Sequence, residues 1–342
     1  MTTLKVLALG IKREKKDNVL DVYYPHIQVI KESVQLTCAK NIFSDLAEEI
    51  ESFFDEDITS FKTISQQNQS YCDIKKGYYY IDDLNMAIQT AEEAYLKLHL
   101  ISKRLVKPHE INLEGLFGIL TNVAWTNKGP ILPTDLDSVR LQYIMSDQPL
   151  VVSHIDKFPY MINYHVPSGV RIASGSQVRL GAYLGEGTTV MPAGYINFNA
   201  GTLGHAMVEG RVSAGVVVGE KSDIGGGASI MGTLSGGNKT VISIGDQCLL
   251  GANSGTGISL GTGCTIGAGV YVTAAMPIFL YDNDNNPINL NGDIVTEPNN
   301  CVKGEDLSGK TFLLFIQDSK SGKVICKPNK KLIQLNNDLH KN

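Results

Sequence analysis

The sequence predicts a mainly β protein, with a parallel β-helix of hexapeptide repeats between an N-terminal α/β domain and a small C-terminal β extension. Three observations support this prediction. An aliphatic residue returns every six positions through the middle of the chain, 25 of the 34 glycines fall between residues 166 and 275, and the helical spacing occurs before residue 159. The expected domains are residues 1–158, 159–275 and 276–342.

The N-terminal region has the pattern of mixed α/β structure. Segments 4–12 and 20–30 are typical of strands on either side of a charged turn. Segment 82–106 has the best helical spacing, with Asp82 or Asp83 as the N-cap. The apolar stripe expected on this helix is Ile88, Ala91, Tyr95, Leu98, Ile101 and Leu105.

A period of six fits neither an α-helix, which repeats at 3.6, nor a half-buried strand, which repeats at 2. It is the repeat of a parallel β-helix, in which each hexapeptide forms one side of a triangular coil and points its aliphatic residue inward. Successive coils stack at about 4.8 Å. The residues expected inside are Val166, Ile172, Val178, Leu184, Val190, Ile196, Val212, Val218, Ile224, Ile230, Ile244, Leu250, Leu260, Ile266 and Val272.

Two segments break the repeat, and we interpret both as insertions. The first is 197–210, with the sequence NFNAGTLGHAMVEG, and the second is 231–241. Repeat proteins place their insertions on one face, which is often the binding face. The C-terminal region is expected to contain an Asn-rich loop at 281–300 and a hairpin formed by 310–317 and 323–329.

Composition excludes several classes of protein. The net charge of −5 argues against a nucleic-acid partner, and no apolar run is long enough for a membrane span. The N-terminal apolar run is also too short for a secretion signal. The six cysteines are scattered, so we expect reduced thiols and a cytoplasmic protein. The coil region has only two histidines, His165 and His205, and therefore no three-histidine metal set.

The first insertion carries the candidate chemistry. Between Gly187 and Gly219 the only formal charges are Glu209 and Arg211. Isolated charges in an apolar, glycine-rich setting are costly to desolvate unless they are used or paired. The two residues therefore form either a functional site or a structural ion pair. The polar residues expected to bind substrate are Asn197, Asn199 and Thr202.

The motifs MVEGR, GGGASIMGTLSGG and VISIG..CLLGANSG.GISLG resemble the tetrahydrodipicolinate N-succinyltransferases that have a large N-terminal domain. The resemblance extends to YLKLHLISKRLVKPHEINLEGLFGILTNVAWTNKGP and DKFPYMINYHVPSGVRIA. It implies a left-handed β-helix and a homotrimer with active sites between subunits. It also implies succinyl transfer from succinyl-CoA, as co-substrate without a bound cofactor, to the amino group of ring-opened tetrahydrodipicolinate, in the succinylase branch toward diaminopimelate and lysine.

The resemblance also implies roles for individual residues. Glu209 is the catalytic position, acting either through an acyl-anhydride or as a general base. Some members hold a magnesium ion with acidic residues where this chain has Ser176 and Ala193, so no metal is expected. The positions that correspond to succinyl-CoA contacts are Arg211, Gly226, Ser229, Ala252, Gly267, Ala268, Ala275, Lys303 and Ser319.

Two alternatives follow from the same pattern. One is another hexapeptide-repeat N-acyltransferase that uses acetyl-CoA or a different amine. The other is a β-helix that acts as a binding or structural module without catalysis.

Overall fold

The computed structural model describes residues 4–30, 39–54, 57–64, 71–235 and 239–330, which form two compact units. The first unit comprises Met1–Leu100 and His109–Pro159, and the second Ile101–Pro108 and Tyr160–Asn342. Residues 101–108 thus belong to the second unit, although their position in the sequence led us to place them in the first domain. None of the described helices is long and apolar enough to cross a membrane.

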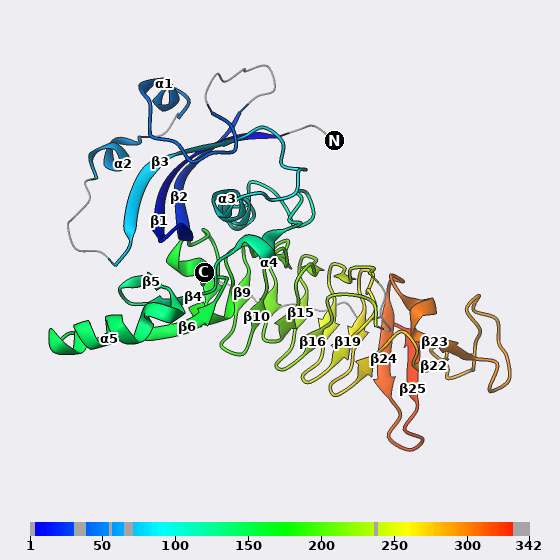
Figure 1. Ribbon diagram of the computed structural model, residues 1–342. Coiled ribbons are helices and arrows are strands. Elements are labelled where there is room, and N and C mark those ends of the chain that lie inside the picture. Colours follow the sequence, from blue (N-terminus) through cyan, green and yellow to red (C-terminus); the bar gives the residue numbers. More distant parts are fainter. Residues whose placement is uncertain (1–3, 31–38, 55–56, 65–70, 236–238, 331–342) are drawn as a thin grey trace. The chain divides into compact units, whose positions relative to one another are not determined.

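The first unit contains two three-stranded antiparallel sheets, with strand orders β2-β1-β3 and β5-β4-β6. Helices α1 and α2 lie on one face of the β2-β1-β3 sheet and α3 lies on the other (Figure 1). The elements are β1 (Lys5–Lys15), β2 (Asn18–Ile30), α1 (Glu48–Glu51), α2 (Thr59–Thr63), β3 (Asp73–Ile81), α3 (Ala91–Ser102), α4 (Leu116–Ile119), β4 (Val123–Thr126), β5 (Gly129–Ile131), α5 (Leu136–Met145) and β6 (Val152–Asp156).

Helix α3 is shorter at both ends than the predicted helix. It begins at Ala91 because the Thr90 hydroxyl accepts a hydrogen bond from the Glu93 N–H at 3.2 Å. The Glu93 carboxylate in turn accepts from the Gln89 N–H at 3.0 Å. The helix ends at Ser102, and the left-handed φ of +61° at Arg104 turns the chain away. Leu105 therefore lies outside the apolar stripe and is 41% exposed.

A buried ion pair fastens α3 to the loops beside it. The Lys97 ammonium lies 2.9 Å from a Glu93 carboxylate oxygen, and both side chains are almost fully buried. The ammonium also donates to the carbonyl oxygens of Met86, at 2.7 Å, and Asn112, at 2.9 Å. Burial lowers the pKa of Lys97 from its ordinary value, against the opposing effect of Glu93. Because every donor of this ammonium has a partner, the residue acts as a structural clamp.

We expect Lys97→Met to lower the free energy of unfolding by about 3–5 kcal/mol, because it leaves the Glu93 carboxylate buried without its cation. Urea denaturation of the two proteins measures the difference. The double variant Lys97→Met/Glu93→Gln is the control, and it should be less destabilised because it contains no uncompensated charge. If the unfolding free energy of Lys97→Met lay within about 1 kcal/mol of the wild-type value, which is the size of one ordinary hydrogen bond, the buried pair would not be an important stabilising contact.

The second unit is a parallel β-helix with three sheets, one for each side of the coil (Figure 1). The long sheet has ten strands in the order β23-β22-β25-β24-β20-β18-β15-β12-β9-β7, the five-stranded sheet has the order β10-β13-β16-β19-β21, and the four-stranded sheet has the order β17-β14-β11-β8. Strands of successive coils pair in parallel, so each coil satisfies the backbone groups of the next.

The coil strands are two residues long, which matches the six-residue repeat. They are β7 (Arg171–Ile172), β8 (Tyr183–Leu184), β9 (Thr189–Val190), β10 (Tyr195–Ile196), β11 (Gly201–Thr202), β12 (Met207–Val208), β13 (Arg211–Val212), β14 (Val217–Val218), β15 (Asp223–Ile224), β16 (Ser229–Ile230), β17 (Ser243–Ile244), β18 (Leu249–Leu250), β19 (Gly255–Thr256), β20 (Thr265–Ile266) and β21 (Tyr271–Val272).

The predicted inward residues from Val178 to Val272 are at most 3% exposed and form one continuous core. The prediction is wrong for Val166, which precedes the first coil and is 69% exposed. The five described cysteines are free thiols, of which all but Cys301 are buried, and Cys38 lies outside the described residues.

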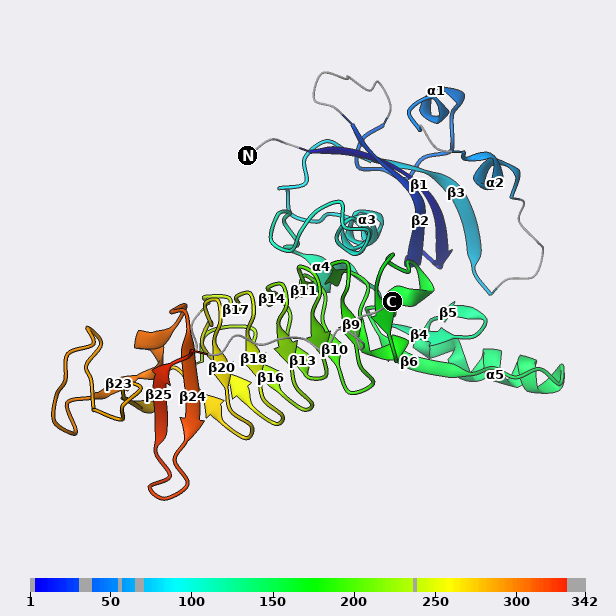
Figure 2. The same cartoon turned by 180° about the vertical axis from the view of Figure 1, so that it is seen from behind.

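The C-terminal segment closes the end of the coil. Its strands are β22 (Pro277–Leu280), β23 (Cys301–Lys303), β24 (Leu313–Gln317) and β25 (Val324–Pro328). Strand β24 adds in parallel to β20, which pairs Phe315 with Ile266, and then forms an antiparallel hairpin with β25. Phe315 is fully buried and Cys326 is 2% exposed, so the hairpin covers the core (Figure 2).

Segment 101–108 is joined to the first coils by side-chain hydrogen bonds to the backbone. The Ser102 hydroxyl accepts from the Gly181 N–H at 2.8 Å. The Arg104 guanidinium donates to the carbonyl oxygens of Leu184, at 2.5 Å, and Ser168, at 2.9 Å. These contacts explain why this segment belongs to the unit that contains the β-helix.

His165 lies in the electrostatic field of this cationic segment. Burial, followed by repulsion from Lys103 and Arg104, lowers the pKa of His165 to about 4 from an ordinary value of 6.5. The folded state therefore prefers the neutral imidazole, while the unfolded chain takes up a proton below about pH 6.5. The unfolded state thus binds more protons between about pH 6.5 and 4, and the folded state loses stability as the pH falls through this window.

We expect His165→Asn to reduce the loss of unfolding free energy between pH 7 and pH 5, because the variant has no imidazole to protonate. Chemical denaturation at both pH values measures the slope. His109→Asn is the matched control, since His109 is exposed and has a φ of +70° that asparagine tolerates. Equal slopes for the wild type and His165→Asn would contradict the assignment.

Candidate functional site

The segment 197–210 is not an insertion, because residues 197–208 follow the six-residue repeat of the coil, and this corrects our interpretation of the sequence. Gly201–Thr202 pairs with strands of the coils before and after it, and so does Met207–Val208. The inward position of β11 is held by Thr202, which is fully buried. Because a threonine stands where the repeat has aliphatic residues elsewhere, the period seemed to stop here.

The irregularity lies at the corner after Val208. The inward residues of the long sheet and the five-stranded sheet are six positions apart in the neighbouring coils, for example Val190 to Ile196 and Ile224 to Ile230. The corresponding inward residues Val208 and Val212 are only four positions apart. Each of them nevertheless pairs in register with the coils on either side. Two residues are therefore missing from this corner, which consists of Glu209, Gly210 and Arg211. We call it the short corner.

The true insertion is the second one that the sequence predicted, between β16 and β17. Ser235 fixes it along the coil, since its N–H donates to the Gly257 carbonyl at 2.9 Å and its hydroxyl accepts from the Ala274 N–H at 2.7 Å. In the next coil, the inward residues Thr256 and Leu260 are only four positions apart instead of six. The coil that contains the insertion is thus followed by a coil that is two residues shorter than the regular ones.

Glu209 is held by its backbone while its carboxylate is left without a partner. Its N–H donates to the Ile224 carbonyl at 2.7 Å, and its own carbonyl accepts from the Gly227 N–H at 3.2 Å. The half-buried side chain extends over Gly226, where a Cβ on that glycine would lie 3.4 Å from the Oε2 atom. Within the described part of the chain, no hydrogen bond or ion pair engages the carboxylate. The carboxylate is therefore available to a ligand.

Arg211 bonds to Ser229 and not to Glu209. Arg211 in β13 lies opposite Ser229 in β16, and the guanidinium Nη2 donates to the Ser229 hydroxyl at 2.7 Å. No ion pair joins Glu209 to Arg211, although both are described residues. Of the two possibilities left open by the sequence, the structural ion pair is therefore wrong. The exposed guanidinium retains donors for an anionic group.

A wall with almost no side chains extends from the short corner toward the C-terminal end of the coil. Gly226, Ala252 and Ala268 occupy the equivalent corner position in three successive coils, as the pairing of Ile224, Leu250 and Ile266 requires. Beside them run Gly225, Gly251 and Gly267, which we call the glycine row. A Cβ at Gly225 would lie 2.6 Å from the Leu250 carbonyl oxygen, so no larger residue fits there.

The remaining predicted contacts lie at the C-terminal end of the coil or after it. Ala275 and Lys303 are exposed and near each other at its C-terminal end, where Lys303 pairs with Glu305 at 3.4 Å. Ser319 is exposed in the turn between β24 and β25. The structure thus gathers Arg211, Gly226, Ser229, Ala252, Gly267 and Ala268 around the short corner or along its wall, and places the other three beyond the wall.

The predicted substrate-binding residues separate into two groups. Asn197 lies on the outer side of the five-stranded sheet, where its Oδ1 accepts from Arg179 at 3.1 Å and from the Phe198 N–H at 2.9 Å. Asn199 has a φ of +51° and forms the next corner of the coil. Thr202 is not available to a ligand, because its hydroxyl is buried and 2.7 Å from that of Thr188. Its predicted role in binding is corrected to a structural one.

Arg179 was missed by the sequence analysis. It lies beside Asn197 through the parallel bridge of Val178 and Ile196, and it adds a second guanidinium to the sheet that contains Arg211. The signal that would have found it was its position directly after the inward residue Val178, which places it at the outer surface.

The positions that correspond to the family's magnesium ligands do not fit a metal. The Ser176 hydroxyl is 3.0 Å from that of Ser174, and Ala193 has no ligand atom. The described residues contain no group of three or more histidine, cysteine or acidic side chains arranged to hold a metal ion. No step of the chemistry is therefore assigned to a metal.

Two family models match parts of this chain. Residues 120–160 match a model of the middle region of tetrahydrodipicolinate N-succinyltransferase, and 241–274 match the hexapeptide repeat of succinyl-transferases. A 2,3,4,5-tetrahydropyridine-2,6-dicarboxylate N-succinyltransferase of Vibrio cholerae is 54% identical over 74% of this chain and 71% of its own. The corresponding protein of Pseudomonas aeruginosa is 52% identical over the same shares.

A solved structure extends the similarity to almost the whole chain. A Campylobacter jejuni protein, assigned as a 2,3,4,5-tetrahydropyridine-2-carboxylate N-succinyltransferase, superposes with a TM-score of 0.79 at 33% identity, covering 98% of this chain and 94% of that one. The coil of the second unit is accordingly a left-handed parallel β-helix. The chain belongs to the tetrahydrodipicolinate N-succinyltransferase family.

Proposed function

We propose that this protein transfers the succinyl group of succinyl-CoA to the amino group of ring-opened tetrahydrodipicolinate, a step toward diaminopimelate and lysine. The observation that carries the proposal is the Glu209 carboxylate, which has no partner among the described residues and lies at the short corner beside a wall of glycine and alanine. Relatives that are 52–54% identical bear the name of this activity, which disfavours the alternative of a different acyl donor.

The short corner supplies the groups that acyl transfer needs. The amine lone pair attacks the thioester carbonyl carbon, a C–N bond forms, and the C–S bond breaks. As a general base, Glu209 accepts the proton that the amine loses and passes it to the departing CoA sulfur. The Arg211 guanidinium, held by Ser229, receives the terminal carboxylate of the succinyl group. Arg179 and Asn197 on the same sheet suit a carboxylate of the acceptor.

The other chemical route is an acyl-anhydride on Glu209, in which its carboxylate attacks the thioester first. The two routes differ when the acceptor is withheld. An anhydride route releases one equivalent of CoA thiol per site in a rapid burst, whereas a general-base route releases none. Rapid-mixing measurement of thiol release with succinyl-CoA alone therefore separates them.

We further propose a homotrimer in the cytoplasm, with each site between two subunits. One coil provides only one wall of the site, and Ala252 and Ala268 on this wall are exposed. A neighbouring coil would cover this wall and exclude water from the thioester. The free thiols of the described cysteines fit a reducing compartment. Ala275, Lys303 and Ser319, which lie beyond the wall, are also proposed as donor contacts.

A thiol-release assay tests the activity. Succinyl-CoA and acetyl-CoA are each supplied with and without tetrahydrodipicolinate, and the CoA released is followed spectroscopically. We expect sustained release only with succinyl-CoA and acceptor together. Equal rates with acetyl-CoA would assign a different donor, and no release with either thioester would leave a non-enzymatic β-helix.

A further inference from the structure

A pocket of about 320 Å³ lies between the Asn-rich segment 281–300 and the C-terminal hairpin, and the proposed chemistry does not use it. Its volume is at the lower end of the range for small-molecule sites. Strand β25 supplies Ile325 and Lys327, and Lys323 directly precedes this strand. Tyr281 and Glu297 come from the Asn-rich segment.

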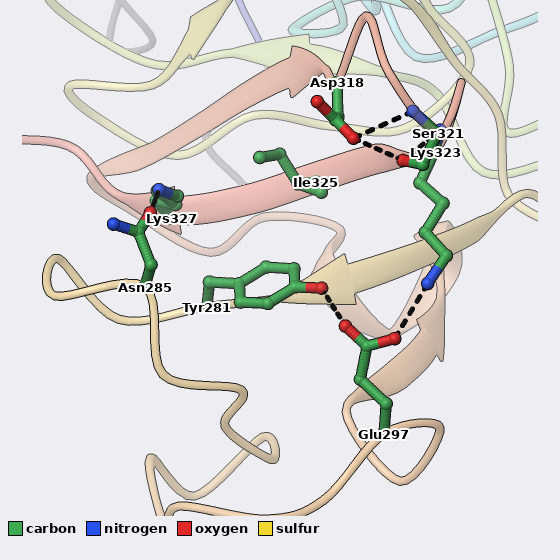
Figure 3. A pocket seen from close by; sticks show the side chains of 8 residues that line it. All are labelled: Tyr281, Asn285, Glu297, Asp318, Ser321, Lys323, Ile325 and Lys327. Atoms are coloured by element: carbon green, nitrogen blue, oxygen red, sulfur yellow. Dashed lines mark hydrogen bonds and ion pairs between the residues drawn. The ribbon is translucent and has the colours of Figure 1, made fainter.

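The two sides of the pocket are held together by the backbone. The Tyr281 N–H donates to the Cys326 carbonyl at 3.0 Å. Cys326 is buried, so the alternation of the strand places Lys323, Ile325 and Lys327 on the opposite, outer face. Figure 3 shows Ile325 between the two lysines, with the Tyr281 ring beside it. An apolar floor therefore separates two charged ends.

One end of the pocket presents a carboxylate. Glu297 pairs with Lys323 at 2.8 Å and also accepts from the Tyr281 hydroxyl. The hydrogen bonds from Lys323 and Tyr281 hold the pKa of Glu297 below its ordinary value, so it is ionised at neutral pH. A carboxylate has about four acceptor sites, so Glu297 can accept from a further donor. The Lys323 ammonium is already neutralised and lies 4.3 Å from the centre of the Phe279 ring.

The other end presents an ammonium group that has no anionic partner. Lys327 donates to the Asn285 amide oxygen and forms no ion pair within the described ranges. It helps to lower the pKa of Asp282, but the Asp282 carboxylate accepts from the N–H groups of Asp284 and Asn286. An ammonium has three donors, so Lys327 can donate to an anionic group of a ligand.

The charges of the pocket favour a ligand that carries one charge of each sign. The two lysines are balanced by Glu297 and Asp318, and the Asp318 carboxylate is engaged in the hairpin turn by Ser321. A lining without net charge gives no advantage to a polyanion. A carboxylate at Lys327 and an ammonium at Glu297 would instead each meet an opposite charge.

The spacing of the two ends indicates how long the ligand is. Lys323 and Lys327 are four residues apart, or about 13 Å along an extended chain. A carboxylate and an amine joined by five methylene groups are separated by six bonds, or about 7.5 Å at about 1.25 Å of advance per bond. One hydrogen bond of about 2.9 Å at each end extends this reach to about 13 Å.

We propose that this pocket binds a linear amino acid whose carboxylate and ammonium groups lie at opposite ends of a methylene chain. The carboxylate contacts Lys327, the ammonium contacts Glu297, and the chain lies on Ile325 and the Tyr281 ring. The proposed site is separate from the short corner and does not rest on the proposed acyl transfer. It gives the Asn-rich segment a binding role.

Calorimetric titration with 6-aminohexanoate, which has this chemistry, tests the proposal. Hexanoate and hexylamine each retain the chain and one charge, whereas glycine retains both charges without the chain. We expect 6-aminohexanoate to bind at least tenfold more tightly than each of the three, because each lacks one of the contacts. No binding of 6-aminohexanoate, or equal affinity for hexanoate or hexylamine, would overturn the proposal.

Variants of the two charged ends locate the binding. Lys327→Met and Glu297→Gln should each weaken the binding of 6-aminohexanoate by about tenfold, through the loss of one charge-assisted contact. Lys327→Arg should restore most of the affinity. Lys310→Met is the matched control, because it removes an exposed lysine that does not line the pocket. Wild-type affinity in Lys327→Met or in Glu297→Gln would show that the ligand is not held between these two ends.

Discussion

Glu209→Gln is expected to lower kcat by about 10²- to 10⁴-fold, the range typical for loss of a positioned general base. The amide has nearly the same shape but accepts no proton at neutral pH, so the structure and KM should change little. Steady-state kinetics with succinyl-CoA and tetrahydrodipicolinate measure the effect. The unfolding free energy should remain close to that of the wild type, because no described residue bonds to this carboxylate.

Glu220→Gln is the matched control for this experiment. Glu220 is an exposed glutamate at a different corner of the same β-helix, where its side chain extends over Gly204. Its substitution should leave kcat unchanged. A Glu209→Gln enzyme that turned over at the wild-type rate would remove this carboxylate from the mechanism under either route.

Arg211→Met should lower kcat/KM for succinyl-CoA by about 100-fold, with a much smaller effect on the slow reaction of acetyl-CoA. The guanidinium and the Ser229 hydroxyl form a paired donor site, and only the succinyl group carries a carboxylate for it. The ratio of kcat/KM for the two donors is therefore the diagnostic quantity. Arg211→Lys should recover part of the loss, because an ammonium retains the charge but not the forked geometry.

Arg140→Met provides the control for general loss of a cation. Arg140 is an exposed arginine on α5 that pairs with Asp137 at 2.7 Å, and it belongs to the first unit. Its substitution should leave the donor ratio unchanged. An Arg211→Met enzyme that lost succinyl and acetyl transfer equally would show that this guanidinium does not recognise the succinyl carboxylate.

The sequence predicts the β-helix well because each inward aliphatic residue has the same structural position in its coil. Ile224, Leu250 and Ile266 are adjacent in space for the same reason that they are in phase in the sequence. The prediction fails where an inward position is polar. Thr202 and Thr256 fill such positions, and the hydroxyl of each finds a partner inside the coil. A search for aliphatic residues at a spacing of six does not detect inward threonines.

The sequence pointed to some residues of the candidate site, but it missed Arg179, misassigned the buried Thr202 and did not give the geometry. Isolation among uncharged neighbours identified Glu209 and Arg211, whereas the spacing of four between Val208 and Val212 became visible only when Thr202 was placed inside. The pocket lined by Tyr281, Glu297, Lys323 and Lys327 was beyond prediction, because it depends on the register of β25 against β24 and on the fold of segment 281–300. Neither follows from a repeat or a motif.

A crystal structure of the protein with bound CoA and an unreactive analogue of the acceptor would locate the thioester sulfur relative to Glu209. We expect the CoA sulfur to lie at the short corner beside the Glu209 carboxylate, with the arm along Gly225, Gly251 and Gly267. CoA bound on the four-stranded sheet, or a Glu209 carboxylate that faces neither the sulfur nor the acceptor amine, would contradict it.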